Sequence, residues 1–208
     1  MTTPTHDDVM AIEHEIMALK AKRDGMRRSI VPEPVEDYRL TLPGGAQATL
    51  SELFGDRDEM ILIHNMGRGC SYCTLWADGI NGLVDHLQDR AALLLTSPDP
   101  ADEMHAFASG RGWRFPLASV EGTTLAHDLG FYKADDEEYP GYWPGASALA
   151  KTEAGIVRTG WTFFGPGDDF CAIWPLLAML PEREWQPKYD YTSAGGSGGA
   201  CGDGCGCS

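Results

Sequence analysis

Residues 60–76 read MILIHNMGRGCSYCTLW, and this stretch decides the fold. Residues 60–64 form a continuous apolar run of the kind found in strands buried in a parallel sheet. From Leu75 onward, apolar side chains recur at helical spacing and close near Asp89. The motif from Cys70 to Cys73 therefore falls between a buried strand and a helix.

The elements outward from this stretch predict an α/β sandwich with a mixed central sheet. Strands are expected at 91–96 and 115–120 (a short edge strand), with hairpins at 38–42/46–50 and 146–150/156–161. Helices or helical turns are expected at 7–28, 51–55, 101–111, 123–129 and 168–180, the last kinked at Pro175, and an acidic, aromatic loop at 131–143. Two βα units followed by a hairpin and a final helix are the order of the thioredoxin fold.

Three parts of the chain differ in composition. Residues 1–34 hold an amphipathic helix that ends before Pro32 and Pro34, and its basic second half is interpreted as a solvated face. Residues 35–186 form the thioredoxin-like domain. Residues 187–208 are rich in Gly and Cys and are expected to form a flexible tail.

Composition narrows the classes of function. The 208 residues are 43% hydrophobic, enough for one domain with a sizeable core. The 31 acidic and 16 basic residues give a net charge of -15, which opposes nucleic-acid binding. Neither a secretory leader nor an apolar run of ~20 residues is seen, so we expect a cytoplasmic protein with no membrane partner. Six cysteines in that compartment indicate catalysis, metal binding or burial.

The spacing of Cys70 and Cys73 fits thiol-disulfide exchange. A sulfur at a helix N-terminus meets free backbone N–H groups and the positive end of the dipole, which favour its thiolate. The second sulfur, one turn on, can attack a mixed disulfide formed at the first. We therefore expect Cys70 to be the nucleophile, with a lowered pKa, and Cys73 to be the resolving thiol. No cofactor is required.

Four further residues are candidates for a supporting role. Arg68 precedes Cys70 by two residues and could stabilise the thiolate, since no acidic residue lies between Glu59 and Asp78. His64 ends the strand and is a candidate proton acceptor or a satisfied histidine. Asp78 is a candidate proton relay to Cys73 or a solvated side chain. Trp76 is expected in the core rather than at the substrate.

Metal binding is the rival hypothesis. A Cys-x-x-Cys pair is half of a zinc site, but the next cysteine, Cys171, falls on the apolar face of a helix and fits a small buried residue. The tail offers three soft ligands, one short of a closed tetrahedral site for zinc or copper: Cys201, Cys205 and Cys207. Its other interpretations are a mobile thiol tail without a ligand and a thiol relay to Cys70.

Several stretches resemble a bacterial thioredoxin-like family, domain-of-unknown-function family 899, predicted to be dithiol-disulfide oxidoreductases. They are residues 50–66, Gly69-Cys70-Ser71-Tyr72-Cys73 with residues 76–79, and Gly112-Trp113-Arg114-Phe115-Pro116 with Ser119. The resemblance runs from about residue 13 to 185. It implies a thioredoxin fold with Cys70 and Cys73 as the redox pair, and it implies no known substrate.

The resemblance has two departures. The approach to Cys70 also looks like that of peroxiredoxins, which place Thr or Ser three residues before their reactive cysteine, where this chain has Gly67. Thioredoxins set a cis-proline opposite the cysteines, and Pro144 is the candidate, although Gly145 intervenes before the hairpin strand.

Three hypotheses follow. The first is a dithiol-disulfide oxidoreductase with a protein or small-molecule disulfide as substrate and a cellular reductant as partner. The second is a soft-metal-binding protein that uses the tail cysteines. The third is a redox-silent adaptor that has the fold without the chemistry.

Overall fold

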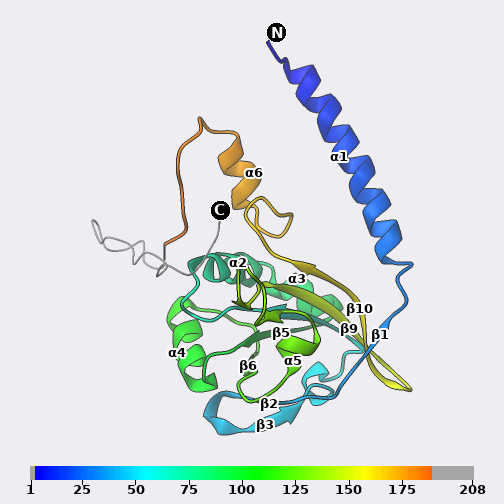
Figure 1. The fold of residues 1–208 in the computed structure, drawn as a ribbon, viewed down its shortest axis with the longest axis vertical. Coiled ribbons are helices and arrows are strands. Elements are labelled where there is room, and N and C mark those ends of the chain that lie inside the picture. The colour runs from blue at the N-terminus through cyan, green and yellow to red at the C-terminus, as the bar shows by residue number, and fades with distance from the viewer. Residues whose placement is uncertain (1–2, 189–208) are drawn as a thin grey trace.

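A mixed sheet forms the centre of the computed structural model, which describes residues 3–188 (Figure 1). In spatial order its described strands are β1 (Glu33–Val35), β10 (Gly155–Phe163), β9 (Gly145–Thr152), β4 (Glu59–His64), β5 (Ala92–Ser97), β6 (Leu117–Ser119), β2 (Arg39–Thr41) and β3 (Gln47–Thr49). Strands β4, β5 and β6 run parallel, and the other pairings are antiparallel. The mixed sheet and the α/β class are as predicted.

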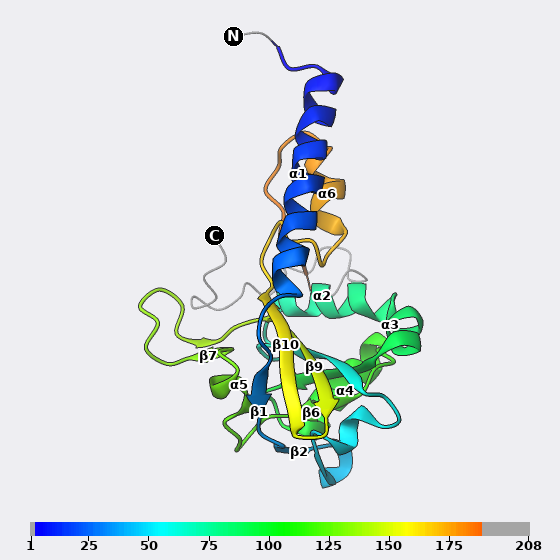
Figure 2. The same cartoon turned by 90° about the vertical axis from the view of Figure 1, so that its right-hand side faces the viewer.

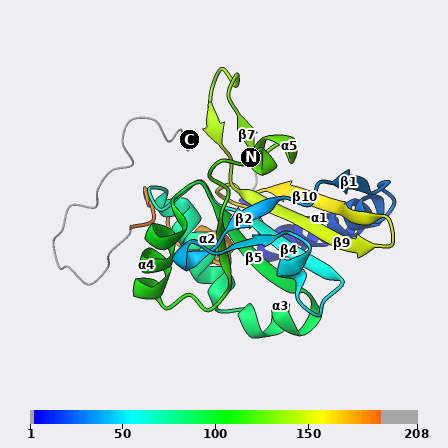
Figure 3. The same cartoon turned by 90° about the horizontal axis from the view of Figure 1, so that it is seen from below.

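Helices occupy both sides of the sheet. The helices are α1 (His6–Arg27), α2 (Ser71–Asn81), α3 (Val84–Arg90), α4 (Ala101–Arg111), α5 (Leu125–Asp128) and α6 (Ile173–Ala178). Short 3-10 turns are η1 (Pro43–Gly45) and η2 (Glu52–Phe54), and a separate ribbon pairs β7 (Tyr132–Lys133) with β8 (Gly141–Tyr142). Figure 3 shows α3 on one side of the sheet and α5 with β7 on the other.

Strand β4 divides the core into two clusters because its side chains alternate between the faces of the sheet. Ile63 faces the cluster formed with α2, α3 and α4. Met60 and Leu62 face the cluster formed with η2 and α5. A fully buried side chain of this kind contributes ~1.5–3 kcal/mol. Alternate residues along β4 therefore point to opposite sides of the sheet and join different clusters.

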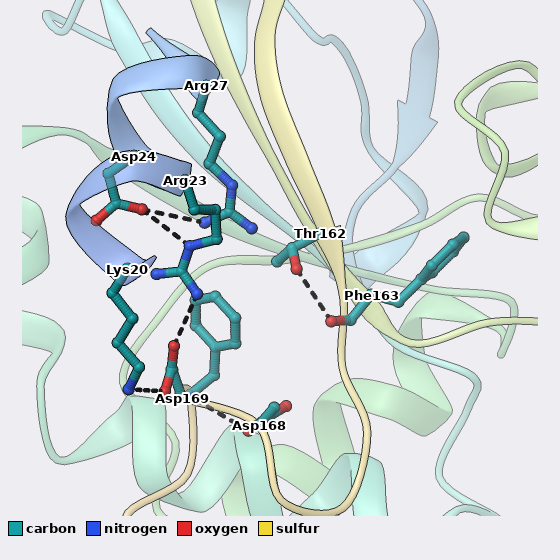
Figure 4. A network of polar contacts seen from close by, with 9 residues as sticks. Lys20, Arg23, Asp24, Arg27, Thr162, Phe163, Asp168 and Asp169 are labelled. Carbon is teal, nitrogen blue, oxygen red and sulfur yellow. Dashed lines mark hydrogen bonds and ion pairs between the residues drawn. The ribbon is translucent and has the colours of Figure 1, made fainter. Parts of the chain in front are cut away.

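Helix α1 stands away from the body of the protein (Figures 1 and 2). Thr5 caps it: its hydroxyl accepts from the backbone N–H of Asp8, and the Asp8 carboxylate accepts from the Thr5 N–H. None of its residues is buried. Near its C-terminal end, Lys20 and Arg23 form ion pairs with Asp169 in the loop after β10 (Figure 4).

Two expectations about the elements were wrong, and one strand was missed. The helix expected to run to Asp89 breaks at Gly82–Leu83 and becomes α2 and α3, because Leu83 leaves helical geometry with ψ 2°. Strand β6 is internal, between β5 and β2, rather than at an edge. Edge strand β1, which pairs with β10, was not predicted; Pro34 is tolerated there because an edge strand has one side without ladder bonds.

The last helix is shorter than expected from 168–180. The Asp168 carboxylate accepts N–H bonds from Gly165 and Phe170, which holds a turn where the helix was expected to begin. Helix α6 starts at Ile173, so Pro175 lies in the first turn, where no intrahelical N–H bond is lost, instead of kinking the interior.

Candidate active site

The loop after β4 delivers Cys70 to the N-cap position of α2. Cys70 is extended, with φ -100° and ψ 110°, and its Sγ accepts the backbone N–H of Cys73 at 3.2 Å. Its carbonyl accepts both the N–H and the hydroxyl of Thr74, at 3.1 and 3.0 Å. The sulfur thus takes the place that Ser or Asp usually fills at a helix start, where negative charge is favoured.

Cys73 lies in the first turn of the same helix. Its Sγ accepts the backbone N–H of Met66 at 3.4 Å. Both cysteines are free thiols and both are 3% exposed. Each sulfur therefore has a backbone donor aimed at it, and each is shielded from water. The backbone donors favour a thiolate at each sulfur, whereas burial opposes the charge and restricts which molecules can reach it.

Asp99, in the turn after β5, holds the loop that carries Cys70. Its carboxylate accepts the backbone N–H of Arg68 at 2.6 Å and the Ser97 hydroxyl at 2.9 Å. Gly67 has φ +113°, and a Cβ there would lie 3.2 Å from Asp99 Oδ2. The Asn65 side-chain oxygen accepts the Gly67 N–H at 2.7 Å. Loop shape therefore depends on a glycine and two polar side chains.

Asp99 was not predicted to take part in the site. A signal was available: 97–100 is a turn directly after the strand that neighbours β4, and the carboxyl ends of adjacent parallel strands meet at one edge of a sheet.

Arg68 does not have the surroundings expected of it. Its guanidinium pairs with Glu103 of α4 and lies 3.9 Å from the Asp99 carboxylate. No acidic residue lies near Arg68 in the sequence, but the fold brings the carboxylates of Asp99 and Glu103 close to its side chain. The side chain is 49% exposed, so these charges and water offset its field at Cys70.

His64 lies on the opposite face of the sheet from the cysteines. It is 4% exposed, its ring stacks on Phe131 at 3.7 Å, and its Nε2 is 2.9 Å from the Ser147 hydroxyl. Burial, helped by the positive charge of Arg158, lowers its pKa to about 3. The proton-acceptor role was wrong: alternation along β4 sends His64 and Ile63 to different faces, and His64 is a satisfied, neutral core histidine.

Asp78 has a structural role in place of the proposed relay. Its carboxylate forms an ion pair with Arg111 and accepts the indole N–H of Trp113 at 2.8 Å. These bonds tie α2 to the end of α4 and engage both carboxylate oxygens. The carboxylate is thus bound by two side chains, while the Asp78 side chain remains 38% exposed.

Trp76 belongs to an aromatic cluster packed on the cysteine side of α2. It is 2% exposed and lies 5.5 Å, centroid to centroid, from Phe164. Tyr72, between the two cysteines, stacks on Trp174 of α6 at 6.2 Å, and Trp174 contacts Trp185 at 6.0 Å. The core position of Trp76 is as predicted. The chain after β10 therefore covers the start of α2.

Cys171 lies in the core cluster that holds Cys70 and Cys73, and it is 6% exposed. Burial raises the pKa of its thiol, helped by the charge of Asp168. These surroundings match those of a small buried residue.

Pro144 immediately precedes β9, whose first residue, Gly145, pairs with His64 at the end of β4. Gly145, which was expected to intervene, is itself the first residue of the strand, and the placement of Pro144 opposite Cys70 stays a prediction. The cis conformation is not found: every peptide bond between described residues is trans.

The tail cysteines, Cys201, Cys205 and Cys207, lie outside the described residues. Within residues 3–188, no group of three or more His, Cys, Asp or Glu side chains could hold a metal ion. Over the same range, no helix has both the length and the apolar character needed to cross a membrane.

Comparison with known proteins agrees with the fold and with the sequence resemblance. The model of a family described as "Bacterial protein of unknown function (DUF899)" matches residues 4–192. Peroxiredoxin Q of Xanthomonas campestris, in a cysteine-to-serine mutant, is 19% identical with a TM-score of 0.53, over 69% of this chain and 91% of that one. A peroxiredoxin-like protein from Aquifex aeolicus is 10% identical with a TM-score of 0.52, over 64% and 75%. No curated protein sequence is significantly similar.

Proposed function

We propose that this chain, which belongs to the DUF899 family of bacterial proteins of unknown function, is a thiol-disulfide oxidoreductase that uses Cys70 and Cys73. The observation that carries the proposal is the helix-capping sulfur: Cys70 Sγ accepts the Cys73 N–H at the start of α2. A peroxiredoxin-like fold supports the placement but not the reaction, because fold does not fix function.

The reaction proceeds in two exchanges. The Cys70 thiolate attacks one sulfur of a substrate disulfide, and the other sulfur leaves as a thiolate that takes a proton. Cys73, deprotonated beside the Met66 N–H, then attacks the Cys70 sulfur and releases the second substrate thiol. The substrate gains two electrons and two protons, and a Cys70–Cys73 disulfide forms. A cellular dithiol reverses this oxidation.

Gly67 bears on the choice between disulfides and peroxides. The residue three before Cys70 has no hydroxyl, and its φ of +113° is one that L side chains rarely adopt. The Thr or Ser that peroxiredoxins place there has no counterpart. Disulfide exchange needs only the two thiols at their present spacing, so it is the better supported reaction.

Access to the thiols sets a second requirement. Cys70 is 3% exposed, and Trp174 packs on the neighbouring Tyr72. A disulfide substrate therefore has to displace the covering aromatic segment or enter beside it. Local opening of a short surface helix such as α6 costs far less than global unfolding.

The test is the pH dependence of Cys70 alkylation in reduced, metal-free Cys73→Ser protein, followed by mass spectrometry of the Cys70 peptide. The midpoint of the profile reports the apparent pKa, and the plateau rate reports access. We expect a midpoint below the ~8.5 of a free cysteine. Trp174→Ala is the matched variant: it should raise the plateau and leave the midpoint in place.

A midpoint at or above that of free cysteine would remove the basis for the proposal. In wild-type protein, a Cys70–Cys73 disulfide should also form in a glutathione redox buffer and be reduced by a dithiol. Failure of this pair to equilibrate, with the thiols alkylatable, would favour the redox-silent adaptor.

A further inference from the structure

Helix α1 exposes an apolar stripe that nothing in the described chain covers. Seven large apolar side chains on it are 37–65% exposed: Val9, Met10, Ile12, Ile16, Met17, Leu19 and Met26. In proteins most of the stability of a helix comes from packing of its apolar face, and here that face is exposed. The stripe therefore calls for a partner surface.

The stripe has the spacing of a coiled-coil seam. Val9, Ile12, Ile16, Leu19 and Met26 follow alternating steps of three and four residues, with Arg23 at the one seam position that is not apolar. In a heptad these are the a and d positions. Such a repeat indicates that the covering element is another helix.

The charges beside the seam identify that helix. Flanking positions in the first half of α1 are acidic, at Asp8, Glu13 and Glu15, and those in the second half are basic, at Lys20, Lys22 and Arg27. One helix end is thus the electrostatic complement of the other. We propose that α1 pairs antiparallel with α1 of a second copy of this chain, forming a two-fold symmetric dimer.

The register follows from the seam. With the two-fold axis between Met17 and Ala18, Ile16 meets the partner's Leu19 and Val9 meets the partner's Met26. The flanking positions then place Glu15 opposite the partner's Lys22. Glu13 likewise faces the partner's Lys20. Each contact occurs twice because the interface is isologous.

A parallel pair is disfavoured by the same charges. In parallel coiled coils each g position meets the following e position of the partner. Asp8 would then face the partner's Glu13, and Lys22 would face the partner's Arg27. Both contacts are repulsive. A single attractive contact lies between these two positions along the helix, and it does not offset both. The antiparallel arrangement is therefore selected.

The shape of the protein permits this dimer. Helix α1 projects from the body, so a partner helix can lie along it with its own body beyond the N-terminal end (Figures 1 and 2). The 22 residues span ~33 Å, over which the two helices can overlap. In this register Lys20 exchanges Asp169 for the partner's Glu13, whereas Arg23 lies opposite the partner's Ile12. The ion pairs of both with Asp169 are exposed and weak, so their loss costs little (Figure 4).

Charge exchange between Glu15 and Lys22 tests the proposal, since no hydrogen bond or ion pair with other described residues engages either one. Sedimentation equilibrium of the full chain should show a concentration-dependent dimer. Glu15→Lys and Lys22→Glu should each weaken it about tenfold or more, because two attractive contacts become repulsive. The double variant should restore it.

The matched control is Ala11→Lys with His14→Lys, which adds the same charge as Glu15→Lys on the outward face of the same helix and should leave the dimer intact. Circular dichroism of each variant checks that the fold is kept. A chain that stays monomeric at all concentrations would overturn the proposal. So would a tighter dimer in Lys22→Glu, which marks a parallel pair, or a double variant that remains dissociated.

Discussion

The buried imidazole of His64 makes the free energy of unfolding depend on pH, in a pH range above that in which most carboxylates titrate. In the native protein its pKa is lowered to about 3, chiefly by burial, with the charge of Arg158 adding to it. In the unfolded chain it is ~6.5. Above pH 6.5 neither state binds the proton and stability is complete. Below it, only the unfolded state takes up the proton, so stability falls until the pH reaches the native pKa.

The magnitude follows from linkage. Each pH unit below 6.5 costs ~1.4 kcal/mol, so lowering the pH from 7 to 5 removes about 2 kcal/mol of unfolding free energy. The loss at pH 5 is the same for any native pKa below about 4, since the native imidazole is neutral there in each case. For a chain of this size it corresponds to a fall in melting temperature of roughly 4–8 °C.

The assay is urea unfolding of wild type and His64→Gln at pH 7, 6 and 5. The amide of glutamine can still bond the Ser147 hydroxyl but takes up no proton, so the pH-dependent loss should be smaller in the variant by about 2 kcal/mol. His86→Gln, at an exposed position, controls for the loss of one histidine. Parallel curves for wild type and His64→Gln would refute the assignment of a neutral His64.

The same variant tests the site. Because His64 faces away from the cysteines, His64→Gln should leave the pH midpoint of Cys70 alkylation unchanged. A displaced midpoint would return His64 to the catalytic machinery.

Three further changes probe the loop and the tail. Gly67→Ala forces a side chain into positive φ against Asp99, so we expect a loss of ~1–3 kcal/mol in unfolding free energy and slower alkylation of Cys70; wild-type stability would contradict the loop geometry. Arg68→Ala should change the alkylation rate at pH 7 by less than about threefold, because Glu103 and Asp99 already offset this exposed charge; a larger loss would mean that Arg68 does stabilise the thiolate. Serine replacement of the three tail cysteines should leave Cys70 alkylation unchanged, and a fall in rate, or the loss of copurified zinc or copper measured by mass spectrometry, would assign the tail a part in exchange or metal binding.

The features predicted correctly are those encoded within a few residues of one another. The apolar run of β4, the cysteine at a helix start and the following helical pattern are local, because strand and helix periodicities and the N-cap position are properties of adjacent residues. Cys70 and Cys73 needed no long-range information to be placed. The mixed sheet followed from the order of such segments.

The errors come from contacts between distant segments. Nothing near Arg68 in sequence indicated that Glu103 would pair with it, nor that Asp78 would bind Arg111. The final helix was overextended because apolar spacing continues through 170–180, while the Asp168 side chain fixes a turn there instead. Apolar periodicity records which face a helix would bury, not whether the backbone hydrogen bonds have another partner.

His64 is a different kind of error, because the sequence did contain the answer. Cys70 and the helix after it cover one face of the sheet. The strand residues that pack beneath α2 point to the same face as Ile63, and His64, the next residue, points to the other face. Nearness in sequence to a reactive cysteine is therefore weak evidence for a catalytic role when the residue lies on a strand. A residue one position removed along a strand points to the opposite side of the sheet, where Ser147 and Phe131 account for this histidine completely.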